Sequence, residues 1–201
     1  MTTPGNLPPN PRPHLHTARR TAAQILMDEH GLILQVLSAL EKRIDALEAG
    51  AQPDPVFLKK AVEFLQSFAD RCHHGKEEGI LFKMMVEDLD YPRNAGPVAV
   101  LTTEHETGRV FNRRIAEASA LLGQDPAAAR QVIANGRDYI QLLRIHIDRE
   151  DNVVFPMVEQ FLDDADQARL AAAFEQFDRD EIEVDRREAQ LRLLEDLTKH
   201  G

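Results

Sequence analysis

The sequence predicts an all-α protein, an up-down antiparallel four-helix bundle with an additional C-terminal helix and an extended N-terminal arm. Two observations predict this fold. Apolar residues recur at helical spacing through most of the 201-residue chain, and no segment shows the two-residue alternation of a half-buried strand. The helical segments are long and the linkers between them are short, which favours antiparallel packing around one core.

Four segments supply the predicted bundle, which we place at residues 17–162. The segments cover residues 17–48, 54–88, 97–122 and 125–161. Asp54-Pro55 and Asp125-Pro126 are each typical of a helix N-cap followed by a first-turn proline. Gly50 and Gly123 are typical residues at a helix C-terminus.

The two ends of the chain lie outside this predicted bundle. Residues 1–16 form a proline-rich segment, because five of the eleven prolines fall within the first thirteen positions. Prolines lack the amide proton of regular secondary structure, so we expect an extended arm there. Residues 163–201 are rich in alanine and charge and predict one further helix that packs on the bundle.

The bulk composition excludes some partners. The formal net charge is -10 and no basic block occurs, which argues against nucleic acid and anionic membranes as partners. No apolar run approaches a membrane span, the opening residues lack the features of a secretory signal, and Cys72 is the single cysteine. We therefore expect a cytoplasmic protein whose partners are small molecules, metals or proteins, with its oligomeric state left open.

An internal repeat carries the functional prediction. The segment HHGKEEGILFKM (residues 73–84) aligns without a gap with HIDREDNVVFPM (residues 146–157). This alignment superposes His73 on His146 and Glu77 on Glu150. Residues at i and i+4 lie on one helix face, so each His-x-x-x-Glu pair can point at one place.

The other two helices contribute one histidine each. His30 follows a glutamate within DEH and lies in the apolar stripe of its helix, and His105 follows a glutamate within TEH. Burying imidazoles and carboxylates together is costly unless they are paired or bind metal. Carboxylate and histidine clusters inside four-helix bundles bind two metal ions, and mixed nitrogen and oxygen donors suit iron, manganese or zinc.

Simpler explanations exist for single residues. One His-x-x-x-Glu pair is common on an exposed helix, and one histidine on an apolar stripe is usually a hydrogen-bonded core residue. His74 could be a surface neighbour, since it lies about 100° around the helix from His73. Tyr139 could be a core residue. The matched placement of both pairs and both lone histidines favours the metal site.

These motifs resemble the hemerythrin-like family, also called the HHE cation-binding domain. The resemblance covers residues 18–162 through MDEH, HHGKEEGILF, TEHETGR and HIDREDNVVFP. It implies a four-helix bundle that holds two non-haem irons with an oxo or hydroxo bridge, with manganese or zinc as possible substitutes. The implied ligands are His30, His73, Glu77, His105, His146 and Glu150, with the two glutamates bridging the metals.

The sequence departs from the oxygen-carrying members of that family. Arg109 stands where those proteins have a second histidine on the third helix. We expect His74 to replace the lost ligand, although two adjacent residues reach one cluster only through splayed rotamers or a local bulge of the helix. Tyr139 or water is the alternative ligand. With His74 bound, one coordination position would remain for O2, peroxide or NO.

The resemblance therefore predicts a protein that binds or senses O2, or handles peroxide or NO, in preference to a dedicated enzyme. Two alternatives remain open at this point. One is a redox enzyme that degrades peroxide, and the other is an iron-handling protein that repairs iron-sulfur centres under nitrosative stress.

Overall fold

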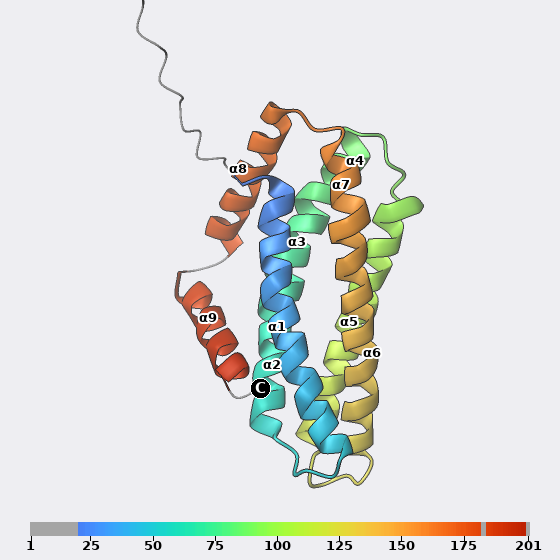
Figure 1. The fold of residues 1–201 in the computed structure, drawn as a ribbon, viewed down its shortest axis with the longest axis vertical. Coiled ribbons are helices and arrows are strands. Elements are labelled where there is room, and N and C mark those ends of the chain that lie inside the picture. The colour runs from blue at the N-terminus through green and yellow to red at the C-terminus, as the bar shows by residue number, and fades with distance from the viewer. Residues whose placement is uncertain (1–19, 182–183, 200–201) are drawn as a thin grey trace, which may run out of the picture.

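The computed structural model describes residues 20–181 and 184–199 and shows the predicted antiparallel four-helix bundle (Figure 1). Its first and third helices are α1 (Ala22–Glu48) and α5 (Gly96–Ala120). Its second helix comprises α2 (Pro55–Phe64), η1 (Leu65–His73), α3 (His74–Lys76), η2 (Glu77–Leu81) and α4 (Phe82–Glu87). Its fourth comprises α6 (Ala128–Arg149), η3 (Glu150–Val154) and α7 (Phe155–Glu159). The described residues contain no strand, which confirms the all-α class.

Three segments of the second and fourth helices, η1, η2 and η3, have the wider turn of a π-helix. Such turns are rare, and they concentrate at functional sites. The segments η2 and η3 begin at Glu77 and Glu150, the two glutamates that the internal repeat superposes. The segment η1 ends at His73, whereas the equivalent stretch of the fourth helix, within α6, is a regular α-helix.

The observed caps explain where the helices begin. Thr21 caps α1 through a hydrogen bond from the amide of Gln24, so this helix begins at Ala22 and not at the predicted residue 17. The predicted cap at Asp54 is confirmed, since its side chain accepts from the amide of Phe57. The predicted start at Asp125 is wrong by a few residues, because its carboxylate and carbonyl form a turn before α6.

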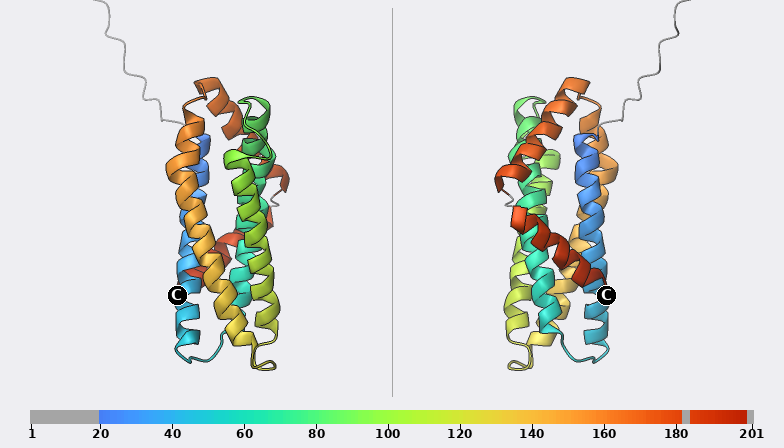
Figure 2. Two further views of the ribbon diagram at one scale, coloured as in Figure 1. Left: turned by 90° about the vertical axis from the view of Figure 1, so that its right-hand side faces the viewer. Right: turned by 90° about the vertical axis from the view of Figure 1, so that its left-hand side faces the viewer.

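The C-terminal region forms two helices, α8 (Asp164–Glu181) and α9 (Val184–Lys199), where the sequence predicted one. Both pack on the bundle: α8 contacts α1 and η2, and α9 contacts α1 and α2 (Figure 2). Phe174 and Leu197 are the buried anchors of these helices. The predicted arm, residues 1–16, lies outside the described part of the chain.

A polar layer divides the interior of the bundle. One apolar cluster contains Ile33 and Leu37 of α1, and another contains Leu26 of the same helix. His30 lies between them on the same buried face. Burial of this apolar surface holds the four helices in register and fixes the height of the polar layer. Among the described helices, none is long and apolar enough to cross a membrane.

Candidate metal centre

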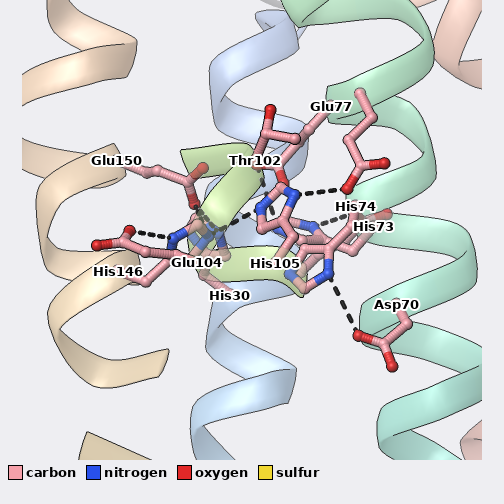
Figure 3. Close-up of polar contacts among 12 residues, drawn as sticks. His30, Asp70, His73, His74, Glu77, Thr102, Glu104, His105, His146 and Glu150 are labelled. Atoms are coloured by element: carbon pink, nitrogen blue, oxygen red, sulfur yellow. Dashed lines mark hydrogen bonds and ion pairs between the residues drawn. The ribbon is translucent and has the colours of Figure 1, made fainter. Parts of the chain in front are cut away.

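All seven side chains that the sequence singled out meet in the polar layer. Figure 3 shows the imidazoles and carboxylates converging from the four helices of the bundle. None of the seven is more than 2% exposed. Their donor atoms form two groups, each spanning no more than 4.8 Å, that could hold a metal ion. One group contains His74, Glu77, His105 and His146, and the other contains His30, His73, Glu77 and Glu150.

The two glutamates lie between the groups. Glu77 Oε1 is 3.4 Å from His73 Nε2, and its Oε2 is 3.4 Å from His105 Nε2. Glu150 Oε2 is 3.2 Å from the Nε2 atoms of both His30 and His146. Each carboxylate therefore faces one histidine of each group, which is the arrangement that a carboxylate bridging two metals requires.

Carboxylates on the outer side of the rings orient four of the histidines. An ionised carboxylate only accepts hydrogen bonds, so each Nδ1 donates its proton, and in a neutral ring Nε2 then carries the lone pair that faces the site. The Nδ1 to oxygen distances are 2.7–2.9 Å. The pairs are His30 with Asp151, His73 with Glu29, His105 with Glu78 and His146 with Glu104.

These outer pairs occur at equivalent positions in the two halves of the internal repeat. Glu29 and Glu104 each also bind a cation, Lys76 in the first half and Arg149 in the second. Lys76 is fully buried because Asp178 of α8 pairs with it at 3.1 Å. The helix α8 thus completes the charge balance on one side of the site.

His74 differs from the other four histidines. Its ring stacks on His105 with centroids 3.8 Å apart, so it lies inside the site and not on the surface. The π-helical turn of η1 ends directly before it and supplies the local bulge that two inward-facing neighbours need. Its Nδ1 is 3.3 Å from Asp70 Oδ1, yet neither atom forms a hydrogen bond of good geometry.

The charges of the site set its protonation before any metal binds. Burial alone would lower the pKa of His73, but the charge of Glu77 and hydrogen bonds with Glu29 and Glu77 raise it to about 10. Burial would likewise lower the pKa of His146, which hydrogen bonding and the charge of Glu150 raise to about 9. Burial and the neighbouring histidines lower the pKa of His74 well below its ordinary value.

Two other residues from the sequence predictions have different surroundings. Arg109 donates to Glu78 and Glu106 at 2.7 Å each, so it supports the carboxylate that orients His105. Tyr139 is fully buried and its hydroxyl forms no hydrogen bond with the described chain. Burial, with the charge of Asp70, raises its pKa well above the ordinary value.

The residues present fit a pair of metal ions. His30 Nε2, His73 Nε2 and all four oxygens of Glu77 and Glu150 are buried without hydrogen-bond partners of good geometry. Buried polar atoms are rarely left in that state, and each one calls for an explanation such as a bound ion. A metal ion between these atoms would give all of them a partner in one group. A second ion would fit the other group, where the Nε2 atoms of His105 and His146 lie 3.1 Å apart.

The sequence motifs identify all seven side chains but neither Asp70 nor Asn112. Asn112 lies two turns after His105 and is buried with both amide atoms unpaired. The internal repeat contains a signal for both residues, because each position is polar in one half of the repeat and apolar in the other.

Comparisons with known proteins agree with this geometry. Three curated relatives, one from Mycobacterium bovis and two from strains of Mycobacterium tuberculosis, are uncharacterized proteins that are each 28% identical to this chain over 160 residues. The aligned region covers 77% of this chain, which spans only about 60% of the length of these relatives. No solved structure matches the chain significantly. The sequence model of the hemerythrin HHE cation-binding domain matches residues 21–158, more than half of the chain, so the protein belongs to that family.

Proposed function

We propose that this chain holds two non-haem irons with an oxo or hydroxo bridge and binds a small ligand, O2, peroxide or NO, at that centre. The observation that carries the proposal is the shared position of the two glutamates. Each faces a histidine of both donor groups at 3.2–3.4 Å, and both are fully buried. Paired metals are the simplest reason for a bundle to bury two such carboxylates at one level.

The donor types favour iron over calcium or magnesium. Five imidazoles and two carboxylates form the set, and nitrogen-rich sites suit iron, manganese and zinc. Iron and manganese both supply redox chemistry towards peroxide, and iron also binds O2 and NO. Zinc would fit the donors but would leave the protein without that chemistry.

The donors are divided unevenly between the two positions. His74, His105 and His146 surround one position, whereas His30 and His73 surround the other, and the glutamates reach both. The second position is therefore one nitrogen donor short. We expect the small ligand to bind there.

The surrounding side chains support binding of a small, weakly polar ligand. Phe155 stacks on the ring of His30 and Phe82 on that of His105, with centroids 5.7 and 5.8 Å apart. Both phenylalanines are buried, and they belong to the apolar cluster at one end of the site. They exclude bulk water from the rings and strengthen the electrostatic interactions within the layer.

Iron-replete expression followed by metal analysis and near-ultraviolet absorption tests this proposal. We expect two irons per chain and the oxo-to-iron absorption band. The variant Glu77→Gln should lose iron and the band, whereas Glu87→Gln, an exposed position on the same helix, should keep both. A colourless wild-type protein without iron would refute the proposal.

Further measurements on the iron-loaded protein separate the possible ligands. Reversible spectral change on cycling O2 identifies a binding protein. Sustained consumption of added peroxide, in which two H2O2 give one O2 and two H2O, identifies an enzyme.

A further inference from the structure

A second group of buried polar atoms has no hydrogen-bond partner within the described chain. It comprises His74 Nδ1, Asp70 Oδ1, both amide atoms of Asn112 and the hydroxyl of Tyr139. His74, Asn112 and Tyr139 are at most 2% exposed, so bulk water does not reach these atoms. Leaving each buried donor or acceptor unpaired would cost about 1–3 kcal/mol.

One close contact and several electrostatic interactions connect these residues. Asp70 Oδ1 faces His74 Nδ1 at 3.3 Å, as Figure 3 shows. Burial raises the pKa of Asp70 to about 7, and the nearby amide of Asn112 and the charge of Arg109 limit this rise. The pKa of Tyr139 in turn responds to the charge of Asp70. The four residues come from three helices of the bundle, namely η1 with α3, α5 and α6.

The internal repeat shows that this polar group is confined to one half of the molecule. In the register that superposes His73 on His146, Asp70 corresponds to Leu143 and His74 to Ile147. Both of these residues are buried in the apolar cluster.

Asn112 follows the same rule. In the register that superposes His30 on His105, it corresponds to Leu37, which is also fully buried in that cluster. An apolar residue therefore packs well in this environment. A polar residue at each of three such positions indicates a built site, since each one alone would destabilise the core.

The chemistry of the unpaired atoms defines the occupant. The Asn112 side chain presents an NH2 group that donates and a carbonyl oxygen that accepts, so one partner for both must accept and donate hydrogen bonds. A metal cation would leave the amide donor unpaired, and O2 or NO would leave the amide acceptor unpaired. An anion would meet Asp70 without a free cation, because Arg109 already pairs with Glu78 and Glu106. Water meets every requirement.

We propose that Asp70, Asn112 and Tyr139 hold an ordered water molecule on the outer side of His74, and that this water positions the His74 ring to bind metal through Nε2. Carboxylates at 2.7–2.9 Å orient the other four histidines directly. His74 receives its orientation through water, which can adjust as the metal changes its coordination. Asp70, with 14% of its side chain exposed, connects the site with solvent.

This inference rests on the proposed di-iron centre, and two variants of Asn112 in the iron-loaded full-length chain test it. Asn112→Leu places the residue of the other half at this position and removes the water. It should shift the oxo-to-iron absorption and speed the loss of iron to a chelator about tenfold. Asn112→Ser keeps a group that donates and accepts, so it should retain the spectrum and the slow loss.

A packing role for Asn112 predicts the opposite order, because leucine would fill the space and serine would leave a cavity. Observing that order would overturn the inference. Tyr139→Phe should change the spectrum in the same direction as Asn112→Leu, while Tyr91→Phe, at the other tyrosine of the chain, should not. An unchanged spectrum in Tyr139→Phe would remove that residue from the site and overturn the assignment.

A high-resolution crystal structure of the iron-loaded wild-type protein tests the site without any variant. We expect ordered solvent within hydrogen-bond distance of both amide atoms of Asn112. A dry site in a protein that contains two irons would overturn this inference alone. Absence of iron would instead overturn the proposed function.

Discussion

Binding of a divalent metal to this chain should become about a hundredfold tighter between pH 7 and pH 8. In the metal-free protein, burial opposes the charge on His73, but Glu77 and Glu29 overcome it and raise its pKa to about 10. Glu150 overcomes burial in the same way at His146 and raises that pKa to about 9. Both rings therefore carry a proton on each nitrogen at neutral pH. Each ring must lose the Nε2 proton before that nitrogen can bind a metal.

The magnitude follows from the number of protons. Each proton released contributes a factor of about ten per pH unit, and two contribute about a hundredfold. Burial and the charge of His73 lower the pKa of His30, but its hydrogen bonds with Asp151 and Glu150 outweigh them and raise it, so His30 adds to this dependence. An ordinary histidine, with a pKa near 6.5, is already neutral in most molecules above pH 7 and would contribute little. His74 contributes nothing, since its pKa is lowered well below that value.

The same pKa values determine how the stability of the metal-free fold depends on pH. Because both are raised, the two ion pairs stabilise the folded state fully below about pH 6.5. This stabilisation is lost as the pH rises through the folded values of about 9 and about 10. Metal should therefore stabilise the protein more at pH 8 than at pH 7.

Competition between the protein and a chelator for Zn²⁺ measures this dependence, after correction for the chelator's own protonation. Calorimetry in two buffers of different ionisation enthalpy counts the protons directly. Glu77→Gln should bind Zn²⁺ more weakly, and the slope of log affinity against pH for this residual binding should fall from about two to about one, because His73 loses its main electrostatic support. A wild-type slope below about one half would refute the reasoning.

Three further predictions concern His74, the docking of α8 and the metal itself. His74→Ala should change the oxo-to-iron absorption and weaken iron retention, and an unaltered spectrum with full iron content would reject His74 as a ligand. Gly75→Ala should place a Cβ 2.7 Å from the Phe177 ring and leave the protein about 1–3 kcal/mol less stable in thermal unfolding than Gly79→Ala, whose new Cβ meets nothing within 4 Å. The unfolding free energy of the protein stripped of iron by a chelator should be about 3 kcal/mol lower than that of the protein with free metal at a hundred times the Kd. An unchanged melting temperature would contradict this prediction.

Much of the fold could be predicted from local pattern. Helical periodicity and the Asp54 cap located the helices to within a few residues, because burial of one apolar face and hydrogen bonding of the first turn are local properties. The division between α8 and α9 could not be predicted. The alanine- and charge-rich C-terminal sequence has no proline or glycine between residues 157 and 200 that would mark the end of one helix and the start of the next.

The site was predictable where spacing alone sets direction. The i and i+4 rule requires His73 and Glu77 to share a face, and their donor atoms lie 3.4 Å apart. The partners of the outer nitrogens were not predictable in this way. Asp151 lies on the fourth helix and reaches His30 on the first, so their pairing depends on how the helices pack.

The π-helical segment η1 explains why the two halves could diverge. A regular helix directs adjacent side chains about 100° apart, which allows one donor for each turn. In the second half the regular α6 presents His146 and leaves Ile147 to the apolar core. In the first half the wider turn of η1 brings both His73 and His74 inward. Two identical halves would supply equal numbers of imidazoles to both donor groups, whereas this one change of helical geometry gives one group three imidazoles and the other two.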